Sequence, residues 1–158
     1  ELLNKEPVKR VEESLKKFDP NLKIIVLDTT ARTAKDAANS LKCELGAIVK
    51  SLVFRTEDEF LICLVSGDKR CSLNKLKKIL NKKDVSMANA DQVKENTGFS
   101  IGGVAPTGHL KKLNIIVDKS LSRFKYVYGA AGHPDCVFRI TYPELVKLTI
   151  GSEQEIIE

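Results

Sequence analysis

The sequence predicts an α+β fold, a single domain over residues 1–158 in which helices flank a mixed β-sheet. A length of 158 residues is usual for one domain and is enough to bury a core. Segments whose apolar residues alternate with a period of two are interleaved with segments that show helical spacing. Several neighbouring strands are separated by only a few residues, as in hairpins, which favours a mixed sheet over a doubly wound parallel sheet.

The first half of the chain alternates helices and strands. Apolar residues at helical spacing predict an amphipathic helix over 6–18. A short β-branched strand over 22–27 follows, and then Thr33 opens a helix rich in small residues through a Thr-x-x-Asp pattern that approximates a capping box. Two apolar strands over 47–54 and 59–65 are close enough in sequence to form an antiparallel hairpin.

The second half repeats this alternation around a glycine-rich segment at 98–108. Its predicted elements are helices over 72–80 and 89–95, strands over 113–117, 125–128 and 136–140, and a last helix that ends at 148. Asn89 is the expected N-cap of the second of these helices, and Thr141 with Glu144 forms a capping box for the last one.

Lys50 lies in an otherwise apolar strand, and period-two alternation places it on the same face as Leu52 and Phe54. A buried, unpaired ammonium is costly, so such a lysine usually meets an anion or lines a cleft. Three interpretations are open: a structural lysine with a solvated head, a general base with a lowered pKa, or an anchor for a phosphate or hydroxyl. We favour the anchor, because an ammonium beside a ribose-phosphate end needs no pKa shift.

The segment Gly103-Val104-Ala105-Pro106 lies in the glycine-rich loop. Glycine lets the backbone approach a ligand without an intervening side chain, and proline stiffens the loop. Backbone N–H groups held in this way can stabilise the oxyanion of a hydrolysis. An ordinary tight turn explains the loop equally well when it is taken alone, and Gly102 and Gly108 can serve turn geometry only.

Five segments in this order resemble the YbaK/ProX-type aminoacyl-tRNA deacylases, the free-standing relatives of the editing domain inserted in bacterial prolyl-tRNA synthetase. They are Thr33 to Ala38, IVKSLVF around Lys50, LVSGDKR at 64–70, TGFSIGGVAPTG at 97–108 and GAAGHPDCVFRI at 129–140. The resemblance covers roughly residues 8–150. It implies an α+β fold like that editing domain, with a curved mixed sheet and a cleft over one face.

The resemblance also implies a catalytic set of Lys50, Gly103 and His133. Lys50 matches the family's active-site lysine, and the 103–106 segment matches its GxxP loop. Related proteins place a polar residue that shapes the pocket in the region of His133. From the residues alone His133 is equally well a turn residue in Gly-His-Pro-Asp, with Asp135 as its partner if it contacts substrate. His109 is expected to be exposed.

Further residues are expected to bind substrate around this set, and each has a structural alternative. The threonines can be caps or strand ends, the SGD turn a solvated hairpin exit, and the apolar residues plain core. The predicted substrate-binding set is Thr29, Thr30, Thr33, Ser51, Phe54, Asp68, Arg70, Ser100, Ile101, Gly102, Val104, Ala105, Pro106 and Asp135.

The net charge of +5 is concentrated between residues 69 and 83, where seven of fifteen residues are basic. Such a cluster is a candidate contact for a phosphate backbone, although most charge runs are solvated helix faces. With the resemblance, tRNA contact is the favoured interpretation. The predicted tRNA-binding residues are Lys69, Lys75, Lys77, Lys78, Lys82 and Lys83.

The expected function is trans-editing: hydrolysis of the ester of mischarged aminoacyl-tRNA, most plausibly tRNA-Pro bearing alanine, and after it cysteine, serine or 2-aminobutyrate. The ester is already activated, so the lack of a Gly-x-Ser-x-Gly elbow is consistent with this expectation. The alternatives are a catalytically inactive tRNA-binding module that assists a synthetase, and a phosphate-binding protein. The expected partners are aminoacyl-tRNA and prolyl-tRNA synthetase.

No metal or organic cofactor is implied, because the four cysteines and two histidines do not match a zinc-ligand spacing. The cysteines are expected to be reduced, with Cys63 in the core. No apolar run reaches eighteen residues, so no membrane contact is expected and the predicted location is the cytoplasm.

Overall fold

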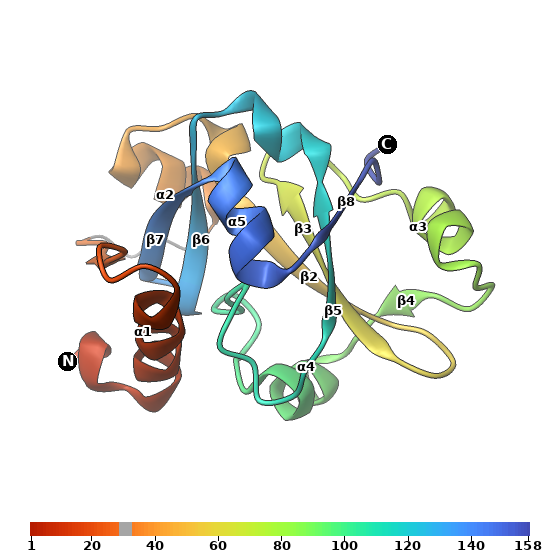
Figure 1. Ribbon diagram of the computed structural model, residues 1–158, viewed down its shortest axis with the longest axis horizontal. Coiled ribbons are helices and arrows are strands. Elements are labelled where there is room, and N and C mark those ends of the chain that lie inside the picture. Colours follow the sequence, from red (N-terminus) through yellow and green to blue (C-terminus); the bar gives the residue numbers. More distant parts are fainter. Residues whose placement is uncertain (29–32) are drawn as a thin grey trace.

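The computed structural model describes residues 1–28 and 33–158 and confirms the predicted α+β class (Figure 1). Thr29 and Thr30, predicted to bind substrate, lie outside the described residues. The described strands form two sheets. One has the order β1 (Ile24–Val26), β7 (Cys136–Thr141), β6 (Tyr126–His133); the other has the order β4 (Ser86–Met87), β2 (Val49–Arg55), β3 (Phe60–Ser66), β5 (Asn114–Asp118), β8 (Ser152–Gln154).

The larger sheet is mixed, as expected. β2 pairs antiparallel with β3 and β4, whereas β5 pairs parallel with β3 and with β8. The smaller sheet is antiparallel throughout. A single parallel bridge between Ile48 and Tyr128 joins the two sheets.

The helices begin where the sequence places their caps. The described α-helices are α1 (Glu6–Phe18), α2 (Ala34–Leu41), α3 (Leu73–Leu80), α4 (Ala90–Thr97) and α5 (Tyr142–Thr149), and the 3₁₀ turns are η1 (Leu2–Asn4), η2 (Leu45–Ala47) and η3 (Lys119–Arg123). Thr33, Asn89 and Thr141 each accept a hydrogen bond from a backbone N–H of the first turn of their helix, and Asn89 forms a full capping box with Gln92.

Most predicted strand ends shift by one or two residues in the structure, and one strand is clearly longer than predicted. The first strand shrinks from 22–27 to Ile24–Val26, and the strand predicted over 125–128 continues to His133. A register shift between Ala130 and His133 interrupts its alternation, and Gly132 has a positive φ of 89° there. His133 is therefore the last residue of a strand, paired with Cys136, rather than part of an open turn.

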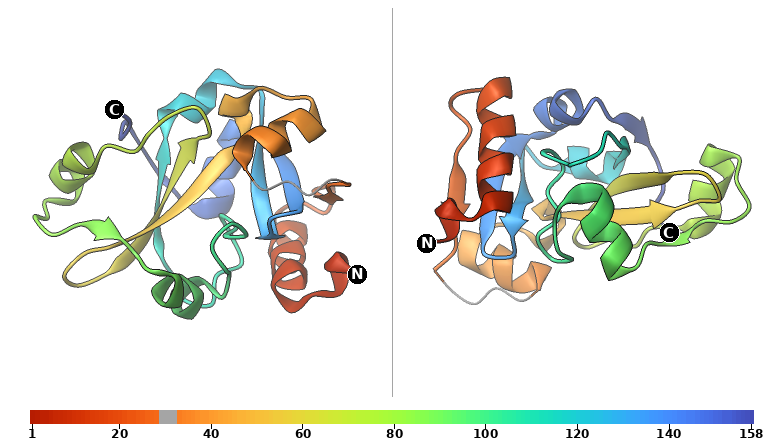
Figure 2. Two further views of the ribbon diagram at one scale, coloured as in Figure 1. Left: turned by 180° about the vertical axis from the view of Figure 1, so that it is seen from behind. Right: turned by 90° about the horizontal axis from the view of Figure 1, so that it is seen from below.

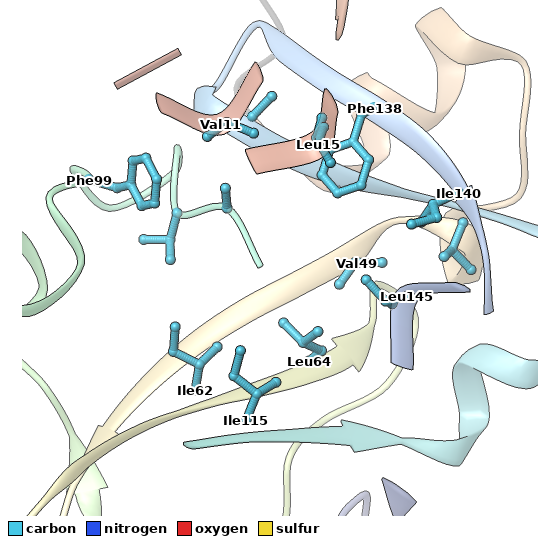
Figure 3. Close-up of a cluster of buried hydrophobic side chains, with 14 of the residues drawn as sticks. Val11, Leu15, Val49, Ile62, Leu64, Phe99, Ile115, Phe138, Ile140 and Leu145 are labelled. Atoms are coloured by element: carbon cyan, nitrogen blue, oxygen red, sulfur yellow. The ribbon is translucent and has the colours of Figure 1, made fainter. Parts of the chain in front are cut away.

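The main core lies between the two sheets and α1. Figure 3 shows Val11 and Leu15 of α1 close to Phe138, with Ile62 and Leu64 of the larger sheet below them. A second core cluster lies under α3 and includes Leu76. Cys63 belongs to this second cluster and is fully buried, as predicted.

Candidate active site

A cavity of about 750 Å³ opens where the two sheets meet. Its walls come from the first turn of α2, the start of β2, the glycine loop, and the end of β6 with the turn into β7. Eight of the predicted site residues line it: Thr33, Lys50, Ser51, Ile101, Gly102, Val104, His133 and Asp135. These residues are up to about a hundred positions apart in sequence, so the fold brings them together.

Lys50 is half-buried in the cavity wall, and its ammonium donates a hydrogen bond to the backbone carbonyl of Lys69. Burial lowers the pKa of Lys50 below the ordinary lysine value, while the nearby charge of Asp68 acts in the opposite direction. The side chain is therefore held in place and partly desolvated. These two properties suit an ammonium that meets an anionic or polar ligand group.

Ser51 follows Lys50 in β2 and also lines the cavity. Its hydroxyl oxygen is buried and has no hydrogen-bond partner among the residues that the structure describes. A buried hydroxyl without a partner is costly, so this oxygen is a suitable group for a bound ligand to satisfy.

Gly103 has a structural reason to be glycine. Its N–H donates to the carbonyl of Ser100 at 2.9 Å, and its carbonyl accepts from the N–H of Gly132 at 3.0 Å. A Cβ at this position would lie 2.9 Å from the backbone nitrogen of His133. The Gly103 peptide thus fastens the loop to β6 and is not itself among the cavity-lining groups.

The neighbours of Gly103 face the ligand space instead. Gly102 and Val104 line the cavity, and within the described part of the chain no hydrogen bond engages either of their N–H groups. Backbone donors of this kind can bind a carbonyl oxygen or an oxyanion. The loop therefore offers donors on both sides of the residue that the sequence singled out.

His133 lines the cavity beside Asp135. Its Nδ1 accepts a hydrogen bond of 3.0 Å from the backbone N–H of Asp135, so the proton of the neutral ring is on Nε2. The ring is thereby prepared to donate from Nε2 rather than to accept a proton there. The Asp135 carbonyl in turn accepts from the N–H of Leu27, which fixes this turn to the end of β1.

The prediction that His109 is exposed is wrong. His109 is partly buried, bonds through Nε2 to the carbonyl of Ala105 at 2.7 Å, and packs edge-on against Phe99. Burial lowers its pKa, so the ring is neutral over a wider pH range than a free histidine. Its contacts hold the glycine loop through residues that do not line the cavity.

Some predicted substrate-binding residues do not reach the cavity. Phe54 is 2% exposed and packs in the core cluster under α3, because the strand face that carries it is covered by that helix. Ala105 and Pro106 are buried inside the loop, and Ser100 is exposed outside the lining. The alternative of plain core or turn residues therefore fits these four positions.

Asp68 and Arg70 flank Lys69, whose backbone carbonyl binds the ammonium of Lys50. Asp68 forms an ion pair with Arg123 at 2.7 Å, and that guanidinium holds the pKa of Asp68 below its usual range. Arg70 is exposed, and its backbone carbonyl accepts from the N–H of Glu158. Neither side chain lines the cavity itself.

Sequence reasoning missed part of the lining. Ala34 and Ala37 of α2, Leu52 of β2, Tyr128 and Ala130 of β6, and Pro134 and Val137 after it complete the apolar walls together with Ile48 and Val49. Tyr128, Ala130 and Val137 share one face of the smaller sheet, where Ala130 pairs with Val137. A prediction that continued the strand beyond 128 would have found this face by alternation.

Apart from Lys69, the predicted tRNA-binding lysines lie at the other end of the molecule from α2, on and after α3 (Figure 2). Lys75 donates to the carbonyl of Ile157 at 2.7 Å, and Lys82 pairs with Asp58 at 2.8 Å. The side chains of Lys77, Lys78 and Lys83 make no hydrogen bond or ion pair with the described residues and leave their charges available. Lys69 is the member of the cluster next to the cavity, through its carbonyl bond to Lys50.

Residues 1–28 and 33–158 contain no group of three His, Cys, Asp or Glu side chains arranged to hold a metal ion. None of the helices in these residues is long and apolar enough to cross a membrane.

Comparison with known proteins identifies relatives of the whole fold. Residues 28–148 match the profile of the aminoacyl-tRNA editing domain. The chain is 30% identical over 139 residues to a proline–tRNA ligase of Bacillus velezensis, an alignment that covers 87% of this chain and 23% of the ligase. It is 31% identical over 125 residues to the uncharacterized protein YwhH of Bacillus subtilis, with 78% of this chain and 79% of YwhH covered.

A solved structure gives the same result. The crystal structure of a candidate trans-editing enzyme for prolyl tRNA synthetase superposes with a TM-score of 0.93 at 37% identity and covers 98% of each chain. The chain spans less than a quarter of the ligase, so it corresponds to one part of that enzyme. The predicted resemblance to this family is confirmed. The chain belongs to the aminoacyl-tRNA editing domain family.

Proposed function

We propose that residues 1–158 form a single trans-editing domain that hydrolyses the ester of tRNA-Pro charged with a small non-cognate amino acid. The observation that carries the proposal is the set of polar groups in one cavity: the half-buried Lys50 ammonium, the Ser51 hydroxyl without a partner among the described residues, and the N–H groups of Gly102 and Val104, which no described hydrogen bond engages. The likeness to a candidate trans-editing enzyme for prolyl tRNA synthetase supports it.

In the proposed reaction, water attacks the carbonyl carbon of the aminoacyl ester. The N–H groups of Gly102 and Val104 donate to the oxyanion of the tetrahedral intermediate, in the role that the sequence assigned to Gly103. The C–O bond to the ribose then breaks, the ribose oxygen takes up one proton of the attacking water, and the amino acid leaves as a carboxylate while the second proton is released to solvent. The ester is activated, so no nucleophilic side chain is needed.

Lys50 binds the terminal nucleotide in this scheme, through a phosphate or a ribose hydroxyl. Its amine remains an ammonium and therefore serves as an anchor, the interpretation favoured from the sequence. Ser51 and the Nε2–H of His133 donate to the ribose or to the ester, and Asp135 faces the α-ammonium of the amino acid. Each of these assignments satisfies a polar group that faces the cavity.

The cavity discriminates by size in this proposal. A synthetase separates small apolar side chains by only about 10–200-fold per methylene, so a second and smaller site is needed to remove errors. The small side chains of Ala34, Ala37 and Ala130 leave space beside the bulkier Ile101 and Tyr128. Alanine is the first candidate for the amino acid, followed by cysteine, serine and 2-aminobutyrate.

The basic cluster around α3 is proposed to contact the tRNA body. Lys77, Lys78 and Lys83 supply charges that neutralise phosphates, and Lys69 is the member of the cluster next to the cavity. The tRNA would then extend from the cavity along the 69–83 segment. Prolyl-tRNA synthetase is the proposed source of the mischarged substrate and a candidate partner.

The test is deacylation of tRNA-Pro charged in parallel with alanine, cysteine, serine, 2-aminobutyrate and proline. Fast release of one or more small non-cognate residues, with proline retained, is the expected result. Lys50→Ala should abolish this release, whereas Lys82→Ala, which removes a lysine far from the cavity, should leave it. If every ester survives while tRNA binding persists, the chain is a binding module and the hydrolytic proposal fails.

A further inference from the structure

We propose that Arg123 is a positioning residue for the reaction: it holds the 66–69 turn, whose last carbonyl binds the ammonium of Lys50. The inference rests on the proposed role of Lys50 in catalysis. Arg123 ends η3, outside every segment that carries the family resemblance, and it does not line the cavity. It therefore acts through the turn and not by touching substrate.

The Arg123 guanidinium is fixed on three sides. Its Nε donates to the carbonyl of Ser120 at 2.7 Å, and the ring of Phe124 lies 4.8 Å from the guanidinium carbon. Both outer nitrogens bond the Asp68 carboxylate, at 2.7 and 3.1 Å, and one of them also bonds the Ser66 hydroxyl oxygen at 3.0 Å. A planar group with fixed donors can bind two residues of one turn at once, which a lysine cannot do.

The 66–69 turn is hydrogen-bonded to residues that lie just before β2. The Ser66 hydroxyl accepts from Arg123 and donates to the carbonyl of Gly46 at 2.7 Å. The N–H of Gly67 donates to the carbonyl of Ile48 at 2.7 Å, and the N–H of Lys69 closes the turn on Ser66 at 3.0 Å. The Lys69 carbonyl then accepts from Lys50. A continuous series of hydrogen bonds thus connects Arg123 to the Lys50 ammonium.

Arg123 has a second effect, through charge. Asp68 is close enough to Lys50 to act on it electrostatically, together with Cys71 and Arg70. While Asp68 is paired with Arg123, its carboxylate oxygens are both engaged. Without Arg123, the freed carboxylate would attract the Lys50 ammonium and draw it away from the position in which it faces the cavity. The ion pair therefore keeps Lys50 directed at the ligand.

The experiment compares Arg123→Ala with Arg55→Ala. Arg55 is a matched control, because it also makes a two-pronged ion pair with an aspartate, Asp84, and belongs to the same strand as Lys50. We expect Arg123→Ala to lower kcat for the fastest ester about tenfold or more, by misplacing Lys50, with the KM for tRNA nearly unchanged. Arg123→Lys should give an intermediate kcat. Arg55→Ala should match the wild type.

Adding Asp68→Asn to Arg123→Ala separates positioning from a general loss of structure. Removing the freed carboxylate should restore part of kcat, whereas a merely structural defect would grow worse. Unchanged kcat in Arg123→Ala, an equal loss in Arg55→Ala, or no restoration in the double variant would overturn the proposal.

A readout that does not depend on activity is the NMR titration of the Lys50 side chain with ¹³C-labelled lysine. In Arg123→Ala the freed Asp68 should move the Lys50 titration to higher pH, and in Arg55→Ala the titration should not move. If the wild type hydrolyses none of the esters, the proposed function fails. The titration then still decides whether Arg123 controls Lys50, because an unshifted curve overturns the inference.

Discussion

Two lysines, Lys50 and Lys82, lie at opposite ends of the β2–β3 hairpin in different surroundings. At the cavity end, Lys50 is half-buried, bonds a backbone carbonyl, and has a pKa lowered by burial. At the far end, Lys82 pairs with Asp58 at the surface, and its pKa is raised mainly by that hydrogen bond. A basic residue marks a site when it is desolvated beside unsatisfied groups, and not merely when it lies in a charged run.

The largest difference between the two ends should appear when each lysine is removed. Lys50→Ala should lower kcat/KM for deacylation by about a hundredfold or more, because it removes the anchor of the terminal nucleotide. Lys82→Ala should change it less than about twofold, because an exposed pair contributes little. Single-turnover deacylation of alanyl-tRNA-Pro measures both. Equal effects of the two changes would contradict the comparison.

The glycine loop sharpens the comparison because it lines the same cavity as Lys50. In Gly103→Ala the new Cβ would lie 2.9 Å from the His133 nitrogen, so the loop must move away from β6. We expect a loss of about 1–3 kcal/mol in the free energy of unfolding, as in other overpacked sites, together with slower deacylation. Urea unfolding and single-turnover assays measure the two effects. A variant with wild-type stability would show that the loop relaxes freely.

Lys50 and Lys82 should lose their protons at different pH values, because their surroundings shift the two pKa values in opposite directions. The pKa of Lys50 lies below the ordinary value and that of Lys82 above it, so Lys50 should titrate first as pH rises. Because the ammonium is the binding form, the activity should fall on the alkaline side as Lys50 deprotonates. ¹³C NMR of labelled lysine side chains, assigned with Lys50→Arg and Lys82→Arg, gives both curves. The reverse order would refute the burial argument.

The smallest effect is expected in the basic cluster itself. Replacing Lys77 and Lys78 by alanine should weaken tRNA binding, and the slope of log K against log salt concentration should become shallower by about one for each phosphate that is no longer neutralised. The rate of the bound complex should not change. Lys16→Ala and Lys17→Ala on α1 are controls of equal charge. If they weaken binding as much, the tRNA does not follow α3.

The fold was predictable from the sequence wherever a pattern was long or carried a specific signal. The apolar spacing of α1 and the caps at Thr33, Asn89 and Thr141 predicted these helices correctly. β4 and β8 have only two and three residues, too few for an alternation to show. The end of β6 was missed because a bulge interrupts its period.

The site was predictable in part. Lys50 stood out because a charge in an apolar strand conflicts with its neighbours, and the glycines marked a close backbone approach. Arg123 left no such signal, since it is 55 residues from Asp68 and is an ordinary exposed arginine in sequence. His109 was misjudged because its burial depends on Phe99 and the Ala105 carbonyl, which only the folded loop supplies.

The bridge between Ile48 and Tyr128 has a consequence for how such a pocket can diversify. Because two of the cavity walls belong to the two sheets, which this bridge joins, the width of the cavity depends on the angle at which the sheets diverge. That angle is set by side chains packed between the sheets, such as Leu64 and Phe138. Substrate range can therefore drift through changes in the interior while the residues that touch the ligand stay the same.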